Sequence, residues 1–270
     1  MNKLLSFDAY TLKWIAVVAM VMNHVAIALH PVLPFGAMLP LYAVGGLTYT
    51  IMAYFVVEGY RHTSNLKKYI SRLLIFGLIA QAFHPMVLGV TQMMPGIFLN
   101  IMFTITLSLL VLLMYDKIKA RVLFWLLFVV ACLAALFMDL FFVGVLVPLL
   151  YYAIRNENRR RTLPGVVAGI FWLILGLLSV LPLVVLLNTP GMEQQAGYIL
   201  ADFGMTMDLV WATPTFAIGC FLGAVLIRNY NGDRGKSAKW LFYVAYPLHL
   251  AIIAGIVVVL GITEFSLFGF

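Results

Sequence analysis

The chain has 270 residues, of which 64% are hydrophobic and only 10% are charged, and its mean hydropathy is +1.05. Soluble globular domains are about half apolar, so this composition excludes a water-soluble protein. The net charge is +7, and the distribution of Lys and Arg described below predicts that the positive charge lies on one face of the membrane.

Several apolar stretches contain about 20 residues, which is long enough to cross a hydrocarbon core about 30 Å thick. They predict an all-α, polytopic transmembrane helical bundle that forms a single domain over 1–270. We divide the stretch 121–154 at Met138 and Asp139, because an ionised aspartate prefers the interface to the bilayer interior. The nine predicted spans are 11–29, 39–60, 69–90, 97–114, 121–137, 140–154, 165–187, 208–228 and 239–261.

The charges orient this arrangement. With a cytoplasmic N-terminus, all 17 Lys and Arg residues fall on the inner segments and half of the ten acidic residues fall outside, as the positive-inside rule requires. The C-terminus is then outside, and contacts with anionic membrane lipids explain most of the basic residues. The first span also imitates a cleavable signal peptide, but we expect it to be retained because Asn-His would end such a segment poorly.

The first span carries Lys13 and, eleven residues later, His24. At 100° per residue the two share a helix face and lie about 16 Å apart along the axis. Lys13 can extend to the interface, whereas His24 needs a partner helix or a wet cavity. Asn23 lies about 100° round the helix, where we expect it to brace a neighbouring helix or the cavity edge.

The segment between the second and third spans is strongly charged, with Glu58, Arg61, Lys68 and Arg72 close together. Lys68 and Arg72 share a helix face because they are four residues apart. Arg72 lies about one turn inside the third span, so its charge needs a partner. Glu58 is one candidate and a bound phosphate group is the other, since guanidinium matches phosphate oxygens in bidentate fashion.

Other polar residues lie in later spans. His249 is at a depth similar to that of His24, so the two could share a cavity or, alternatively, His249 could only tie helices together. We interpret His84, beside Gln81, as structural. Asn100 could tie helices or bind a substrate.

A basic cytoplasmic mouth above a histidine-bearing interior suits a ligand with a polyanionic head and a long neutral arm, and acyl-coenzyme A has that shape. Histidine, whose ordinary pKa is about 6.5, can remove a proton from an attacking amine or hydroxyl near neutral pH. No metal cluster and no nucleic-acid module is expected.

The sequence resembles the TraX family, whose best-known member acetylates the N-terminus of conjugative pilin. The resemblance lies in "LKWIAVVAMVMNH", "VVEGYRHTSNLKKYISRLLIFGLIAQ", "LNIMFTI" and "WLFYVAYPLHL". The Lys-x10-His spacing is also similar to a motif of the wider transmembrane acyltransferase superfamily. Two departures from the family pattern are Asn23, where an aspartate is usual before the histidine, and Gln81, where an acidic residue is usual.

The resemblance implies an acetyl-CoA-dependent N- or O-acyltransferase of the bacterial cytoplasmic membrane. Its acceptor would be a protein amine or a glycan hydroxyl, and its mechanism direct transfer or an acetyl-histidine intermediate. The alternatives are a secondary transporter or proton-coupled channel, and a noncatalytic assembly factor. The candidate site comprises His24 and Asn23 as catalytic residues, Lys13, Arg61, Lys68 and Arg72 for the donor, and Glu58, Asn100, Tyr246 and His249 as lining residues.

Overall fold

The computed structural model describes residues 6–88, 98–202, 207–237 and 239–262. These ranges form helices joined by short connections, with isolated β-bridges and no strand. The helices are α1 (Ala9–Leu29), α2 (Phe35–His62), α3 (Leu66–Gln81), α4 (His84–Leu88), α5 (Ile101–Lys117), α6 (Arg121–Ala135), α7 (Val143–Ala153), α8 (Glu157–Leu187), α9 (Glu193–Asp202), α10 (Met207–Arg228) and α11 (Lys239–Val259).

The all-helical prediction is confirmed, and each predicted span contains a helix. Two helices were not expected: the third predicted span divides into α3 and α4, and the outer loop 188–207 contains α9. Within the described ranges, five helices are long and apolar enough to cross a membrane, namely α1, α2, α8, α10 and α11. The full count of nine crossings and the orientation of the termini stay predictions.

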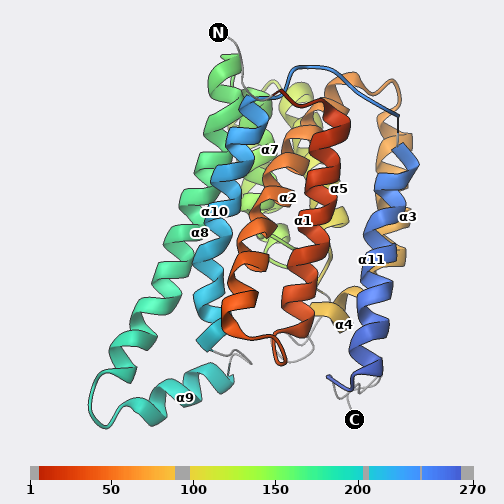
Figure 1. Cartoon of the computed structure of the whole chain (residues 1–270). Helices are drawn as coiled ribbons and strands as arrows, with labels where there is room; N and C mark the ends of the chain where they lie inside the picture. Colours follow the sequence, from red (N-terminus) through yellow and green to blue (C-terminus); the bar gives the residue numbers. More distant parts are fainter. Residues whose placement is uncertain (1–5, 89–97, 203–206, 238, 263–270) are drawn as a thin grey trace.

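The helices stand side by side, with the start of α1 and the last turn of α11 at opposite ends of the bundle, and α9 lying crosswise (Figure 1). At the end where α1 begins, Phe7 pairs with Tyr230, and the Ala9 amide donates to the Asp233 carbonyl at 2.8 Å. We call this the basic end, because Lys13, Arg72, Arg161, Arg234 and Lys236 belong to segments that meet there. The segment 229–237 crosses it as a strap between α10 and α11 (Figure 1).

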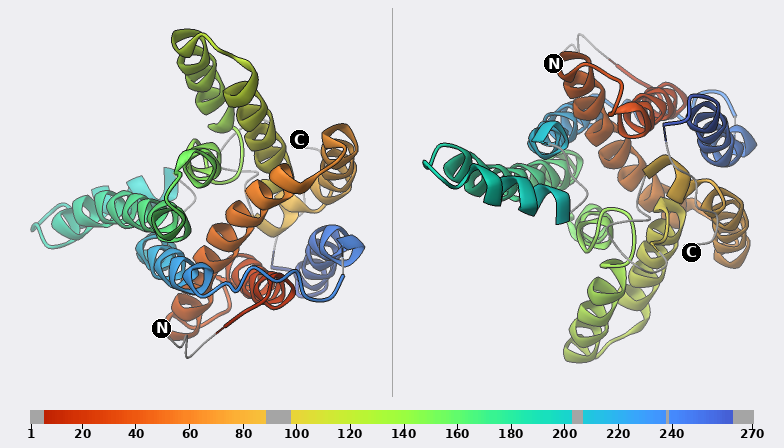
Figure 2. Two further views of the ribbon diagram at one scale, coloured as in Figure 1. Left: turned by 90° about the horizontal axis from the view of Figure 1, so that it is seen from above. Right: turned by 90° about the horizontal axis from the view of Figure 1, so that it is seen from below.

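Seen along the bundle, α2 passes through the centre while α6 and α8 project outward (Figure 2). Projecting helices expose apolar side chains, such as Val122 at 76% and Leu178 at 65%, which is the surface that lipid would cover. In the centre, α2 packs closely on α10, because a side chain at Gly46 or Gly219 would collide with the backbone of the other helix. Small residues at such seams are typical of membrane helix packing.

The turn between α6 and α7 confirms the predicted helix break but corrects the place of its aspartate. The Asp139 amide donates to the Leu99 carbonyl at 2.9 Å, and the Thr104 hydroxyl donates to the Asp139 carbonyl at 2.9 Å. The next two residues, Leu140 and Phe141, have φ angles of 67° and 51°. This tightly held turn directs the Asp139 carboxylate into the bundle, whereas the sequence suggested that it faces water at the outer interface.

Candidate functional site

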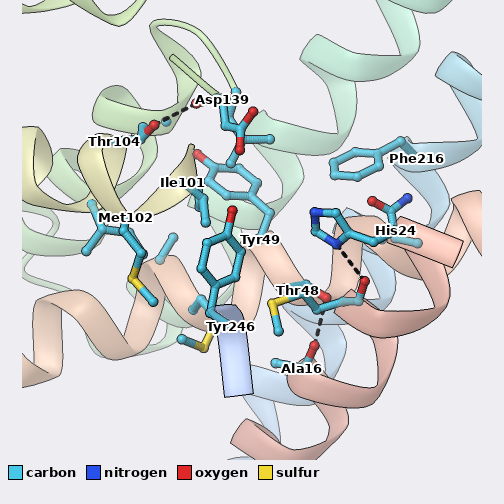
Figure 3. A pocket seen from close by; sticks show the side chains of 18 of the residues that line it. Ala16, His24, Thr48, Tyr49, Ile101, Met102, Thr104, Asp139, Phe216 and Tyr246 are labelled. Atoms are coloured by element: carbon cyan, nitrogen blue, oxygen red, sulfur yellow. Dashed lines mark hydrogen bonds between the residues drawn. The ribbon is translucent and has the colours of Figure 1, made fainter. Parts of the chain in front are cut away.

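A cavity of about 280 Å³ lies inside the bundle, and we call it the deep cavity. Residues of α1, α2, α5, α7, α8, α10 and α11 form its wall together with the turn that carries Asp139 (Figure 3). Most of the lining is apolar or aromatic. Its polar side chains include those of Asn23, His24, Thr48, Tyr49, Thr104, Ser108, Asp139 and Tyr246.

His24 lines the deep cavity, as the sequence predicts, and its hydrogen bonds define a tautomer. Nδ1 lies 2.8 Å from the carbonyl oxygen of Met20, and a carbonyl oxygen can only accept, so Nδ1 must carry the proton. In the neutral ring, Nε2 is therefore the unprotonated nitrogen. Figure 3 shows the other edge of the ring turned toward Tyr49, into the cavity. The ring thus presents a free lone pair to whatever occupies the space.

His249 lies directly behind His24 and is only 6% exposed. Its Nδ1 donates to the Ala245 carbonyl at 2.9 Å, so its Nε2 can accept; Nε2 lies 3.3 Å from Nδ1 of His24. The two rings are 4.8 Å apart between centroids, and Tyr246 is 6.3 Å from His24. The two predicted histidines are therefore in contact, but His24 and Tyr246 line the cavity while His249 supports the ring from behind.

Asn23 also lines the deep cavity. Its Nδ2 is buried and has no hydrogen-bond partner among the described residues. A buried donor without a partner is uncommon, because burying it costs about 1–3 kcal/mol. Nδ2 lies against Gly45 of α2, where an added Cβ would meet it, so the Asn23 side chain packs α1 onto α2.

A second cavity, of about 600 Å³, opens at the basic end, and we call it the vestibule. It is formed by α1, the end of α2, the start of α3, the strap and the start of α11. Four cationic side chains line it, Lys13, Arg72, Arg234 and Lys236, together with the acidic Glu58. The vestibule is therefore rich in positive charge, as the sequence predicts for the mouth of the site.

The two predicted cations of the vestibule are held by aromatic rings. The Lys13 ammonium lies 4.9 Å from the Phe55 centroid and 5.7 Å from that of Phe242, and the Arg72 guanidinium lies 5.6 Å from that of Tyr243. Cation–π contacts orient a cation without neutralising it. None of the ion pairs among the described residues includes Arg72, and its buried Nε has no hydrogen-bond partner there. Its charge stays available to an anion.

The vestibule and the deep cavity are adjacent. Five residues line both, and we call them the neck: Met52, Val56, Met102, Ile105 and Phe242. All five are apolar. The neck therefore joins a cationic entrance to the space that contains His24.

Of the other predicted site residues, Glu58 lines the vestibule, while Arg61 and Lys68 lie outside its lining. Glu58 pairs with Arg61 at 3.5 Å and with His62 at 3.6 Å, and is not paired with Arg72. Arg61 also donates to the Tyr152 carbonyl at 3.0 Å, away from the vestibule lining. Lys68 is exposed and also outside that lining.

Asn100 is fully buried and belongs to neither lining. Its side chain caps α5 by accepting from the Met102 amide at 3.0 Å, and it donates to the Gly77 carbonyl and to Gln81, each at 2.8 Å. These bonds correspond to the helix-tying alternative for Asn100. Gln81, at the position where the family pattern has an acidic residue, donates in turn to the Phe98 carbonyl at 2.7 Å.

Three residues of the two cavities were missed. Arg234 and Lys236 reach the vestibule because the strap folds back over the basic end, and only their charge was visible in the sequence. Asp139 was noticed but assigned to the surface. No three His, Cys, Asp or Glu residues gather as a metal site within the part of the chain that the structure describes.

Comparisons with known proteins agree with the resemblance. The TraX family, described as TraX protein, matches residues 8–257, and the chain therefore belongs to that family. A relative from Dichelobacter nodosus, "Probable fimbrial assembly protein FimC, serogroup H1", is 29% identical over 272 positions, which cover 94% of this chain and 97% of that protein. No solved structure matches.

Proposed function

We propose that this TraX-family chain is an acetyl-CoA-dependent acyltransferase of the bacterial cytoplasmic membrane. The observation that carries the proposal is the neck, through which a cationic vestibule adjoins a cavity lined by His24. A donor with a phosphorylated head and a slender neutral arm fits this arrangement, because the head would lie in the cationic vestibule and the arm in the apolar neck. Arg72, Lys13, Arg234 and Lys236 would hold the phosphates, and the neck would surround the arm.

The chain's own groups can perform the proton transfers of acyl transfer. His24 takes a proton from the attacking amine or hydroxyl through Nε2. This nitrogen is unprotonated because Nδ1 carries the ring proton and donates it to the Met20 carbonyl. Asn23 packs against Gly45 of α2 and would hold α1, and with it the His24 ring, in place beside the thioester. His24 then returns the proton to the leaving sulfur. His249 fixes the orientation of the His24 ring throughout.

The family and the relative bear on the acceptor. The relative's name places it in fimbrial assembly, and a pilin N-terminal amine is the acceptor that the resemblance implies; a glycan hydroxyl is the second candidate. The same name also suits a noncatalytic assembly factor, which would tolerate loss of His24. A proton-coupled transporter is favoured by one observation, the Asp139 carboxylate in the deep cavity, and would act without any thioester.

The test is thioester cleavage by the detergent-purified full-length protein. We expect coenzyme A thiol to be released from acetyl-CoA, with an accelerated release when an acceptor amine or alcohol is added, and a loss of both in His24→Ala. Incubation with labelled acetyl-CoA and no acceptor separates direct transfer, which leaves the protein unlabelled, from an acetyl-histidine route. If the wild type binds no acetyl-CoA and cleaves none, the acyltransferase proposal is wrong.

A further inference from the structure

Asp139 and His84 form a pair at the wall of the deep cavity that the mechanism above does not use. The Asp139 carboxylate lies 3.1 Å from Nε2 of His84, and their side chains are 19% and 1% exposed. Asp139 lines the cavity and His84 lies behind it. Apart from tyrosines, the acidic and basic side chains of the described lining are those of Asp139 and His24. They lie on different sides of the cavity, Asp139 on the turn after α6 and His24 on α1 (Figure 3).

The turn that carries Asp139 is built at a conformational cost. Leu140 and Phe141 are consecutive residues in the left-handed region, where side chains other than glycine cost about 1 kcal/mol or more each. Bonds from Asp139 to Leu99 and from Thr104 to Asp139 hold the turn. Such strain concentrates at functional sites, and here its result is a carboxylate that faces the cavity.

The Asp139 carboxylate has no Lys or Arg beside it in the cavity lining that the structure describes. Nδ1 of His84 is buried and has no partner among the described residues; an N–H there would be an orphaned donor, which is rarer than an orphaned acceptor. Nε2 of His84 faces the Asp139 carboxylate at 3.1 Å, so the ring can donate to a carboxylate oxygen. A carboxylate in a mostly apolar cavity is costly without a counter-charge.

The surroundings indicate what the counter-charge is. Aromatic rings of Tyr42, Tyr49, Trp172, Phe216 and Tyr246 line the same cavity, and aromatic faces attract a cation. No Lys or Arg lines it within the described residues. A small organic cation therefore fits the deep cavity better than a neutral or anionic group does.

The number of protons released in acetylation of an amine also indicates a second proton acceptor beside His24. An amine enters as its ammonium form near neutral pH, because primary amines titrate near pH 10. Transfer of an acetyl group to R–NH₃⁺ yields R–NH–CO–CH₃, the coenzyme A thiol and one free proton. The nitrogen loses two protons: His24 can pass one to the leaving sulfur, but the other needs a second acceptor. A hydroxyl acceptor needs only His24.

We propose that Asp139, paired with His84, binds the acceptor's primary ammonium group and accepts the first of its two protons. This inference rests on the proposed acyltransferase function for its second half, while the binding of an ammonium ion stands on the pair itself. His24 takes the remaining proton from the opposite wall during attack. Among the described residues, the titratable groups around this site are His84 on α4, His24 on α1, Tyr42 and Tyr49 on α2 and Tyr246 on α11.

The first experiment measures binding without chemistry. Thermal stability of the detergent-purified full-length protein is followed with n-butylammonium chloride, with 1-butanol and with NaCl at equal ionic strength. We expect only butylammonium to raise the melting temperature of the wild type, and no such rise in Asp139→Asn. Asp116→Asn is the matched control, because Asp116 binds Tyr60 and Tyr152 outside both cavities, and it should behave as the wild type does.

The second experiment measures acetyl transfer from acetyl-CoA to n-butylamine and to 1-butanol. Asp139→Asn should lose at least about tenfold of kcat/KM for the amine at pH 7 and stay within about twofold for the alcohol. Without the carboxylate, the Asp139→Asn variant can use only the small fraction of butylamine that is already unprotonated. Below pH 10 this fraction rises about tenfold per pH unit, so kcat/KM of the variant for the amine should rise with pH more steeply than that of the wild type. His84→Leu removes the donor that orients the carboxylate, so it should weaken butylammonium binding and amine transfer while sparing alcohol transfer, and His84→Gln, which keeps a donor, should retain both.

Each outcome has a definite reading. If Asp139→Asn keeps the amine preference and pH profile of the wild type, or weakens amine and alcohol transfer equally, the inference is overturned. If Asp139→Asn does not fold, His84→Leu decides, and wild-type ammonium binding and amine transfer in that variant would overturn the inference. Ammonium binding without thioester cleavage would support the site and overturn the acyltransferase function; alcohol transfer without ammonium binding would do the reverse.

Discussion

The vestibule and the deep cavity are polar in different ways. In the vestibule, aromatic rings hold Lys13 and Arg72, and neither cation pairs with a carboxylate of the described residues. In the deep cavity, His24 and Asp139 are fixed by specific hydrogen bonds in a mostly apolar wall. Loosely held charges provide affinity that salt can screen, whereas fixed groups provide geometry. Substitutions in the two regions should therefore affect different kinetic constants.

The largest effect should come from the deep cavity. His24→Ala removes the proposed base, so we expect turnover of acetyl-CoA to fall by about 10² or more while the affinity for acetyl-CoA changes little. His30→Ala is the matched control, since His30 follows α1, bonds to the Ile27 carbonyl and is outside the described lining of both cavities. An active His24→Ala protein would contradict the assignment of the deep cavity as the place of chemistry.

A smaller effect is expected behind the ring. His249→Phe removes the second, longer contact of His24 Nδ1, at 3.3 Å, while the Met20 carbonyl stays as its acceptor; loss of this positioning contact should lower kcat about tenfold, with KM for acetyl-CoA unchanged. His249→Gln can still accept from His24 and should restore part of kcat. Equal rates in the two variants would mean that the 3.3 Å contact has no part in catalysis.

The vestibule should respond through the donor. Arg72→Ala should raise KM for acetyl-CoA about tenfold, the value of one lost charge-assisted bond of about 1.4 kcal/mol, and reduce the dependence of binding on salt. Lys68→Ala serves as the comparison, because Lys68 is exposed beyond the vestibule lining and should change KM by less than about twofold. If Lys68→Ala is as harmful as Arg72→Ala, the phosphates bind outside the vestibule.

The smallest effect should be on stability at the basic end. Asp8 caps α1 by accepting from the Thr11 amide at 2.7 Å, and this bond lowers the pKa of the Asp8 carboxyl below its ordinary value of 3.8. A lowered pKa in the folded state gives stability above the unfolded pKa that is lost as the pH falls through the folded one. Asp8→Ala should therefore lower the melting temperature slightly at pH 7, and the difference should vanish in acid.

The helices and the basic end could be predicted because they follow from local composition. Apolar runs of about 20 residues predict helices, and the segregation of Lys and Arg predicts that they gather at one end of the bundle. His24 was visible for the same reason, since a histidine in an apolar run requires a partner. The inward direction of the Asp139 side chain and the hydrogen bonds of Asn100 could not be predicted. Both depend on contacts with segments that are distant in the sequence. Nothing in a Leu-Phe pair indicates the two left-handed residues that turn Asp139 inward.

The neck has a consequence for the energetics of the cell. Two adjoining cavities in a membrane protein would conduct protons if water filled them continuously. Apolar side chains such as the Met, Val, Ile and Phe of the neck dewet readily and oppose ion passage. The five side chains that the proposed acyl arm would contact would therefore also oppose a proton leak when no arm is bound.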